Sequence, residues 1–311
     1  MQAHTNPDVY LFGHVSTGTV LRLRDPFPKP DGYGEIIETQ ENHSGEATGS
    51  ALVLARLGRS VVLEGNWIGD TPACRRTLAF LQARGIDCSG LRVQPGYAGV
   101  NEIVISDGAT RTVFGRYCDL LFTTPQWDPP NLERLANARA ACVDPSFGEA
   151  TLAVARAARR HGKLLASCDA HPDSELAACC DLLVISNEYL HREFPGAVAD
   201  GKEREELFSR YCASCPGLVV FTAGSRPLWH ARGASKRREF PPFRIAVKDS
   251  AGAGDSFRGA MLDGLLAGWS DEECVRHASA VAALVCLSTP GCVNSPTREE
   301  VRSFLETAAT V

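Results

Sequence analysis

The segment Lys248-Asp249-Ser250-Ala251-Gly252-Ala253-Gly254-Asp255-Ser256-Phe257 lies toward the C-terminal end of the chain. Alternating residues at 243–247 predict a short strand before it, and apolar residues at helical spacing predict a helix over 257–266. Small residues between a strand and a helix leave the first helical amides, in 251–254, without intrahelical partners. Such amides bind anions at the positive end of the helix dipole. Asp255 would lie at the mouth of this anion hole.

An anion hole beside a carboxylate suits phosphoryl transfer, which needs neutralised charge on the moving group and a base for a hydroxyl proton. In this interpretation Gly252, Ala253 and Gly254 hold the phosphoryl group, while Asp255 is the base and contacts the substrate. The alternative is a tight turn whose aspartate caps the helix. The spacing alone leaves both interpretations open.

The stretch from Asp249 to Phe257 resembles the C-terminal signature Asp-Thr-x-Gly-Ala-Gly-Asp-x-Phe of the ribokinase-like (PfkB) carbohydrate kinase family. Further matches, such as the Gly-x-x-Gly-Asp turn at 65–70, extend the resemblance over nearly the whole chain. The resemblance implies an α/β, Rossmann-type three-layer fold with a mostly parallel central sheet and a small β-sheet lid. It also implies transfer of the γ-phosphoryl group of ATP to a hydroxyl, with Mg²⁺.

The size and composition fit one soluble enzyme domain. The 311 residues are 44% hydrophobic and 22% charged, and we expect a single domain over 1–311 with a lid built from about 14–38 and 97–118. A net charge of -5 with scattered arginines argues against a nucleic-acid partner. No apolar run reaches the ~20 residues that cross a bilayer, which argues against a membrane partner. The polar N-terminus lacks a signal peptide's apolar region and predicts a cytoplasmic protein.

The twelve cysteines do not predict a metal site. Cys212 and Cys215 have C-x-x-C spacing, but no second pair stands at zinc-binding distance. Most of the others fall in apolar or helical stretches, where free cysteine packs as a small apolar residue.

Alternating strand and helix patterns predict a parallel sheet covered on both faces. The proline-rich segment after Val20 to Leu23 predicts an exposed edge or loop of the lid. Gly99 to Ser106 and Thr110 to Tyr117 would be further lid strands, joined by a hairpin at Asp107-Gly108. An exposed lid edge would allow a lid-to-lid homodimer. The other expected elements are strands at 9–12, 60–63, 140–143, 163–167, 181–185 and 218–221, and helices at 51–57, 150–161 and 271–287, with one in the second half of 173–180.

The residues that hold the sugar depart from the family pattern. Gly18 stands where the family has an aspartate, Ser44 where it has the first glycine of its N-terminal signature, and Gly49 where it has an asparagine; Gly45 is retained. The expected substrate contacts are Gly45, Asn101, Arg116 and Asp255. Asn101 and Arg116 could instead be solvated residues of the lid.

The expected nucleotide contacts, as the resemblance implies them, are Asn187, Thr222, Gly224, Ser225, Ala251 and Ser279. Leu190 replaces a family glutamate near the metal-bound phosphates, and Glu188 could substitute for it through water bound to magnesium. Asp249 and Ser295 could hold a monovalent cation such as K⁺. Asp144 and Asp169, just past two expected strands, could contact substrate or cap helices.

Three functions follow from these observations. The first is an ATP-dependent kinase of a sugar or modified sugar, which the degraded polyol-binding residues favour. The second is a nucleoside kinase of the same family. The third is a non-catalytic, nucleotide-binding regulatory protein with the kinase fold, against which the intact Gly-Ala-Gly-Asp stands.

Overall fold

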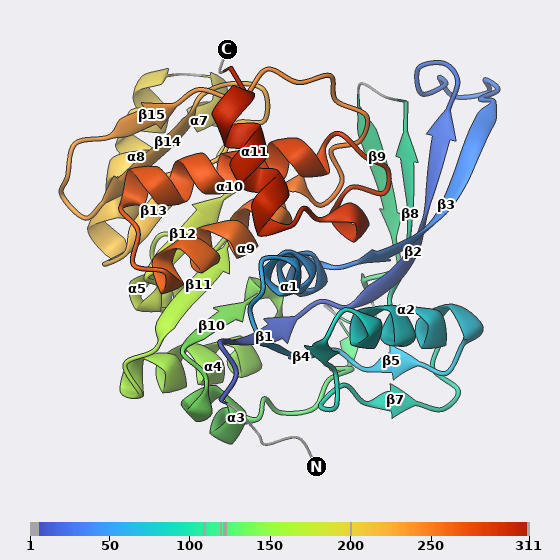
Figure 1. Cartoon of the computed structure of the whole chain (residues 1–311), viewed down its shortest axis with the longest axis horizontal. Helices are drawn as coiled ribbons and strands as arrows, with labels where there is room; N and C mark the ends of the chain where they lie inside the picture. The colour runs from blue at the N-terminus through green and yellow to red at the C-terminus, as the bar shows by residue number, and fades with distance from the viewer. Residues whose placement is uncertain (1–5, 108–109, 119, 121–122, 200, 310–311) are drawn as a thin grey trace.

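A nine-stranded sheet forms the centre of the computed structural model, which describes residues 6–107, 110–118, 120, 123–199 and 201–309 (Figure 1). All neighbours between β13 and β6 are parallel, whereas β14 and β15 join antiparallel at one edge. This confirms the predicted α/β fold with a mostly parallel sheet. In spatial order the strands are β15 (Arg238–Phe240), β14 (Leu228–Arg232), β13 (Leu218–Phe221), β12 (Leu182–Ile185), β11 (Leu164–Cys168), β10 (Ala140–Val143), β1 (Val9–Gly13), β4 (Val61–Gly65) and β6 (Ile86–Asp87).

Helices cover both faces of this sheet, because side chains of each strand alternate between two apolar clusters. In β1, Val9 and Leu11 enter one cluster, and Tyr10 and Phe12 enter the other. The first cluster packs under α1 (Glu46–Arg56), α2 (Pro72–Ala83), α9 (Ala253–Leu266), α10 (Asp271–Val285) and α11 (Arg298–Thr307). The second packs under α3 (Leu132–Asn137), α4 (Glu149–Arg160), α5 (Glu175–Cys179), α6 (Asn187–Glu193), α7 (Pro195–Ala199) and α8 (Gly201–Ser214). No helix in the described part of the chain is long and apolar enough to cross a membrane.

A small four-stranded sheet projects beside the large one (Figure 1). Its order is β3 (Ile36–Ser44), β2 (Ser16–Leu23), β8 (Asn101–Ser106), β9 (Arg111–Gly115). The proline-rich segment after Val20 to Leu23 is a loop, as expected, whereas residues 20–23 themselves belong to β2, an inner strand. β3 continues to Ser44, beyond the expected lid boundary at 38. A further two-stranded pair joins β5 (Ile68–Gly69) and β7 (Val93–Gln94). Gly108 of the expected hairpin lies outside the described residues.

One expected strand and two expected helix starts near the site are also wrong. Residues 243–247 form no strand, and Arg244 N donates instead to Ala309 O at 2.9 Å, outside the sheet. Helix α1 begins at Glu46 rather than at residue 51, and α9 begins at Ala253 rather than at 257. The small and glycine residues that obscure both starts in the sequence are tolerated there because surrounding packing fixes the backbone.

Candidate active site

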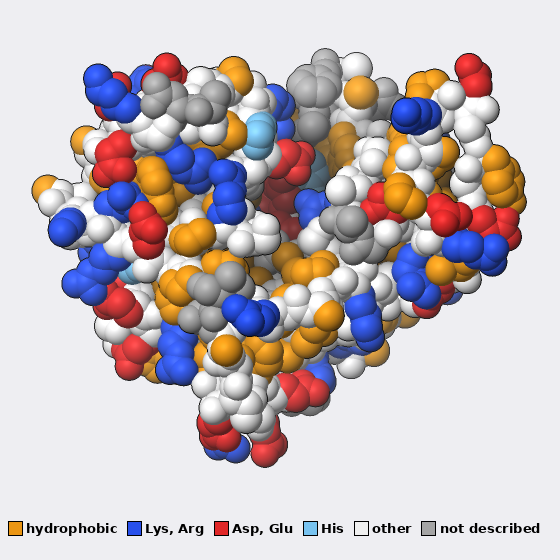
Figure 2. Space-filling model, turned by 90° about the horizontal axis from the view of Figure 1, so that it is seen from above, with side chains coloured by type: hydrophobic (Ala, Val, Ile, Leu, Met, Phe, Trp, Pro, Cys, Tyr) orange, Lys and Arg blue, Asp and Glu red, His pale blue; other side chains and the backbone are white. Residues whose placement is uncertain are grey.

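A hollow lies between the part built on the large sheet and the small sheet, and acidic side chains gather at its floor (Figure 2). In α/β folds of this kind, ligands bind beyond the carboxyl ends of the parallel strands. The residues that the sequence singled out near Asp255 come from α9, from α1 and from the strand ends that adjoin them.

The start of α9 carries amides without partners. Gly252 is the N-cap residue, with φ of 74°, a conformation that favours glycine. Among the described residues, the amides of Gly252, Gly254 and Asp255 have no hydrogen-bond acceptor, and a Cβ added to Gly254 would meet open space. Ala251 N instead donates to Asp249 Oδ1 at 2.9 Å, and Ala253 N to Ser250 O at 3.3 Å. The expected set of amides, 251–254, is therefore corrected to 252, 254 and 255.

Asp255 lies on the first turn of α9 and is partly buried. Loss of water raises its pKa to about 7, with a further increase from Asp144 and an opposing effect of Arg258. Its backbone oxygen accepts a hydrogen bond from Ser50 Oγ of α1 at 2.9 Å. A Cβ at Gly49 would lie 2.7 Å from the Cβ of Asp255, so the glycine at this signature position gives the carboxylate its room.

A buried ion pair lies behind Asp255. Arg258 Nη2 is 2.8 Å from Asp144 Oδ1, and both side chains are almost fully buried. Arg258 also donates from Nε to Ser50 Oγ at 3.1 Å and from Nη1 to Cys168 Sγ at 2.9 Å. Because a buried charge without a partner is costly, this guanidinium fixes the strand ends against α9 and α1.

The two aspartates expected to contact substrate or cap helices both bind backbone amides. Asp144 Oδ2 accepts from His14 N at 2.7 Å and from Ala47 N, in the first turn of α1, at 3.0 Å. Asp169 accepts from the amide and hydroxyl of Ser186, the N-cap of α6, at 2.7 and 2.8 Å. Both therefore hold helix starts in place.

One group of potential metal ligands appears in the described part of the chain: oxygens of Glu46 and Asp144 and the sulfur of Cys168 lie within 4.8 Å of one another. Arg258 contacts two of the three, so its guanidinium supplies positive charge where a metal ion would. The Cys212 and Cys215 thiols are free and buried.

The inner face of the small sheet presents a carboxylate that the sequence did not identify. Gly18, Asn42 and Glu102 are neighbours in register on β2, β3 and β8. Glu102 lies over Gly18, since a Cβ there would be 2.9 Å from Glu102 Cγ. Asn42 Nδ2 donates to Glu102 Oε1 at 3.4 Å, and Tyr117 Oη donates to Oε2. Position 18 lacks the family aspartate, but the carboxylate of Glu102 on the neighbouring strand β8 lies beside it. The charge of Glu102 also adds to the raised pKa of Asp255.

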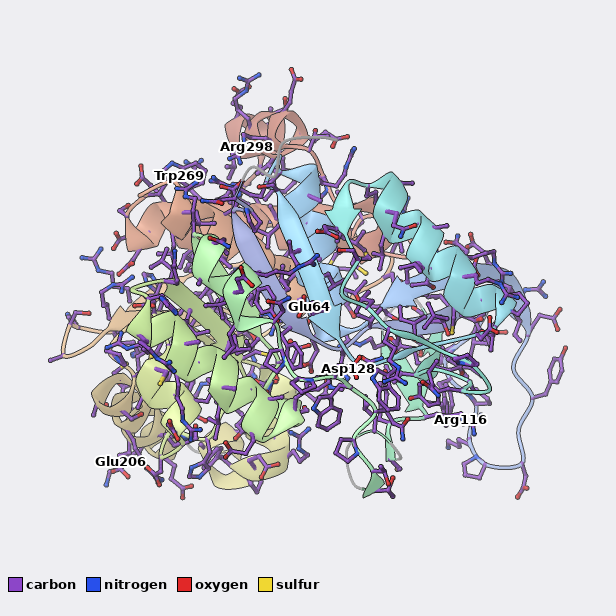
Figure 3. The ribbon with its side chains drawn as sticks, turned by 90° about the horizontal axis from the view of Figure 1, so that it is seen from below. Glu64, Arg116, Asp128, Glu206, Trp269 and Arg298 are labelled. Atoms are coloured by element: carbon purple, nitrogen blue, oxygen red, sulfur yellow. The ribbon has the colours of Figure 1, made fainter. Side chains whose placement is uncertain are left out.

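Two expected substrate residues point elsewhere. Asn101 pairs with Thr17, one residue from Glu102, and so lies on the opposite face of the small sheet. There it lines a pocket of about 280 Å³ together with Ala73 of α2. Arg116, labelled in Figure 3, donates its amide to Asn101 O at 2.9 Å and stands opposite Asn101 in the strand register, so its side chain lies on the same face of the small sheet. The structure does not bring either residue to Asp255.

Gly45 has a backbone role at the start of α1. It is the N-cap residue with φ of 109°, and a Cβ there would lie 2.3 Å from His14 O. Ser44, at the preceding signature position, is buried, and its hydroxyl lies 3.0 Å from Ser16 Oγ.

Four of the six expected nucleotide residues lie near the ends of β12 and β13, whereas Ala251 precedes α9 and Ser279 lies on α10. Thr222 donates from its amide and hydroxyl to Ile185 O at 2.9 and 3.3 Å, and Asn187 Oδ1 accepts from Arg226 at 3.2 Å. Gly224 and Ser225 are exposed, and Gly224 has φ of 62°. Ser279 lies apart in sequence on α10, with its buried Oγ unpaired among the described residues.

The residues near the expected metal positions differ in environment. Glu188 is largely exposed, 3.9 Å from Arg111 Nη2, whereas Leu190 is fully buried in the core and cannot reach a metal. Asp249 is 2% exposed; its Oδ2 has no partner in the described residues, and burial raises its pKa. A buried free carboxylate oxygen fits a cation. The Ser295 hydroxyl donates to Cys292 O.

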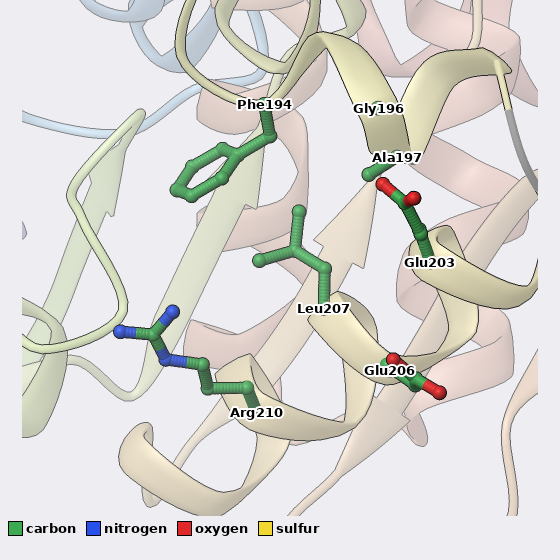
Figure 4. Close-up of a pocket in the computed structure, with 7 residues that line it drawn as sticks. All are labelled: Phe194, Gly196, Ala197, Glu203, Glu206, Leu207 and Arg210. Carbon is green, nitrogen blue, oxygen red and sulfur yellow. The ribbon is translucent and has the colours of Figure 1, made fainter.

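Arg111, which alternates with apolar neighbours in the sequence as Asn101 and Arg116 do and could likewise reach a sugar or be solvated, crosses the hollow. Its Nη1 donates to Ser250 O at 2.6 Å, which ties β9 to the loop before α9. A separate pocket of about 540 Å³ lies between the α6–α7 segment and α8 (Figure 4). Its lining, which includes Phe194, Leu207 and Arg210, contains none of the expected site residues.

The chain is similar to known proteins in both sequence and structure. The family model "pfkB family carbohydrate kinase" matches residues 8–298. An ATP-dependent ribose-1-phosphate kinase of Halopiger xanaduensis is 25% identical, covering 94% of this chain and 96% of its own. A nucleoside kinase of Methanothermobacter thermautotrophicus is 27% identical, covering 96% and 95%. The crystal structure of a candidate ribokinase from Agrobacterium tumefaciens has a TM-score of 0.83 at 26% identity, covering 97% and 98%. The chain therefore belongs to the PfkB family of carbohydrate kinases, phosphotransferases that act on sugar hydroxyls.

Proposed function

We propose that this kinase transfers the γ-phosphoryl group of ATP to a hydroxyl of a sugar or modified sugar, with Asp255 as the general base. The observation that carries the proposal is the start of α9, where a carboxylate with a pKa of about 7 adjoins the unpaired amides of 252, 254 and 255. A base with this pKa is half ionised near neutral pH and can take a hydroxyl proton. The amides would stabilise charge on the transferred group.

The nucleotide would lie at the ends of β12 and β13, near Asn187, Thr222 and Gly224. The name of the Halopiger relative, an ATP-dependent kinase, supports ATP as the donor. Mg²⁺ would neutralise the phosphates, with Glu188 acting through water, and K⁺ would bind Asp249 Oδ2. In this proposal, residues 1–311 fold as a single domain. The small sheet acts as a lid that excludes water from the site.

A nucleoside kinase is the second candidate, because the Methanothermobacter relative bears that name over nearly the full chain. The two functions share the phosphoryl-transfer machinery and differ only in the acceptor.

The test is ADP release by the purified full chain with Mg-ATP across sugars, sugar amines and nucleosides. The proposal predicts turnover with a sugar-type acceptor that depends on Asp255. Turnover confined to nucleosides would favour the second candidate, and no turnover with any alcohol would contradict both.

A further inference from the structure

Carboxyl groups crowd the space next to the proposed base. Asp144 and Glu102 each raise the pKa of Asp255, and Asp144 and Asp255 in turn raise that of Glu46, which burial also raises. Four carboxyl groups from α1, β8, the end of β10 and α9 therefore act on one another across the same hollow.

Positive charge near this group is limited and already engaged. Among the described residues whose charge acts on Asp255, Arg258 is ion-paired with Asp144 at 2.8 Å. Arg111 is the second, and it bonds Ser250 O at the outer rim, 3.9 Å from Glu188. Glu46 and Glu102 therefore lack a bonded cation in the described residues.

Two side chains here, Asn42 and Glu46, also offer buried acceptor atoms that have no donor among the described residues. Asn42, 3% exposed, turns one amide nitrogen to Glu102 and leaves Oδ1 unpaired. Glu46 Oε2 is buried and unpaired as well. A buried acceptor without a donor costs free energy, so both atoms suit a ligand that brings N–H or O–H groups.

A metal ion is the competing occupant, because Glu46 belongs to the group of potential ligands with Asp144 and Cys168. Arg258 already contacts Asp144 and Cys168, which leaves Glu46 as the one member of that group without a bonded cation. The positive charge of the guanidinium beside these ligand atoms repels a divalent ion.

We propose that the acceptor substrate is a cationic, amine-bearing sugar or sugar-like alcohol, whose ammonium group pairs with Glu46 while Glu102 and Asn42 Oδ1 accept its hydroxyl or amine hydrogens. The inference rests on the proposed kinase function and narrows its acceptor. The same excess of carboxylates disfavours acceptors that already carry a phosphate, since like charges at close range repel.

The test compares matched acceptors that differ by one group. ADP release is measured with glucosamine against glucose, with 1-amino-1-deoxyfructose against fructose, and with ribose-1-phosphate against ribose. Calorimetry measures binding of the same compounds without ATP. At least one amine is expected to exceed its hydroxyl twin by about tenfold or more in kcat/KM or affinity, and the phosphate ester is expected to be the poorer of its pair.

The variant Glu46→Gln keeps the shape of the side chain but cannot ionise to pair with an ammonium group. It is expected to reduce the amine-over-hydroxyl ratio by about tenfold. Glu41→Gln is the matched control: Glu41 lies on the opposite face of the small sheet, paired with Arg76 at 2.7 Å, and its loss should leave the ratio unchanged. Thermal melting of both variants separates a selectivity change from a folding defect.

The outcomes distinguish this inference from the proposed function. Turnover of neutral sugars as good as that of their amine twins, or preference for the phosphate ester, refutes the amine assignment and leaves the kinase intact. Amine binding without turnover of any alcohol supports the pocket and contradicts the kinase. Neither turnover nor amine binding refutes both.

Discussion

Asp255→Asn should abolish most turnover and at the same time stabilise the unliganded protein at neutral and higher pH. Asparagine has nearly the same shape but cannot take a proton, so kcat should fall by ~10²–10⁴ while ATP binding is largely retained. The stability gain follows from the raised pKa. A carboxyl with a pKa of about 7 in the folded chain, against its ordinary value of 3.8, destabilises the fold once it ionises.

The effect of Asp255 on the free energy of unfolding depends on pH. Between about pH 4 and pH 7 the unfolded chain binds fewer protons at Asp255 than the folded chain, so the wild type loses stability as pH rises, and the loss is complete above about pH 7. The difference between 3.8 and about 7 corresponds to at most ~4 kcal/mol, since one pKa unit equals 1.36 kcal/mol. Asp255 is only partly buried, so we expect about 2 kcal/mol above pH 7.

Urea denaturation of the wild type and the variant at about pH 5.5 and pH 8 measures this directly. The advantage of Asp255→Asn should grow by about 1–2 kcal/mol between the two. Asp25→Asn, at an exposed aspartate, is the control and should show no such growth. A stability difference that does not depend on pH would contradict the environment assigned to Asp255. A kcat within tenfold of the wild type would contradict its role as the base.

Three other substitutions test neighbouring features. Arg258→Met leaves Asp144 buried without its cation and should cost ~3–5 kcal/mol in urea denaturation; a loss below about 1 kcal/mol would contradict a structural ion pair. Leu190→Glu restores the family glutamate but buries a carboxyl in the core, so it should cost about 3 kcal/mol or more and leave the Mg²⁺ dependence of activity unimproved; a tighter Mg²⁺ response would show that we have misplaced Leu190. Asp249→Asn should weaken activation by K⁺ about tenfold relative to a large organic cation, and an unchanged K⁺ titration would rule out this oxygen as the ligand.

The repeating pattern of the sequence predicted the fold well, because buried parallel strands and amphipathic helices have distinct periods. The strands at 140–143 and 218–221 have the expected bounds. The starts of α1 and α9 could not be read, since Gly45 and Gly252 have positive φ and cap their helices without side-chain bonds. Capping rules look for side-chain acceptors, and at α1 that acceptor is Asp144, distant in sequence.

The departures from the sugar-contact signature have a related physical explanation. A motif compares the residue at one position of the chain with the residue that the family has there. In the folded protein, a side chain from any neighbouring strand can fill the same space. Gly18 looks like a lost carboxylate in the sequence, yet in register it sits under Glu102, whose side chain could not occupy that space if position 18 had a Cβ. Gly49 likewise makes room for Asp255 across the contact between α1 and α9. In the sequence alone, the glycines at these two positions suggest a decayed site. In the structure, each glycine leaves the space that a carboxylate, Glu102 or Asp255, occupies.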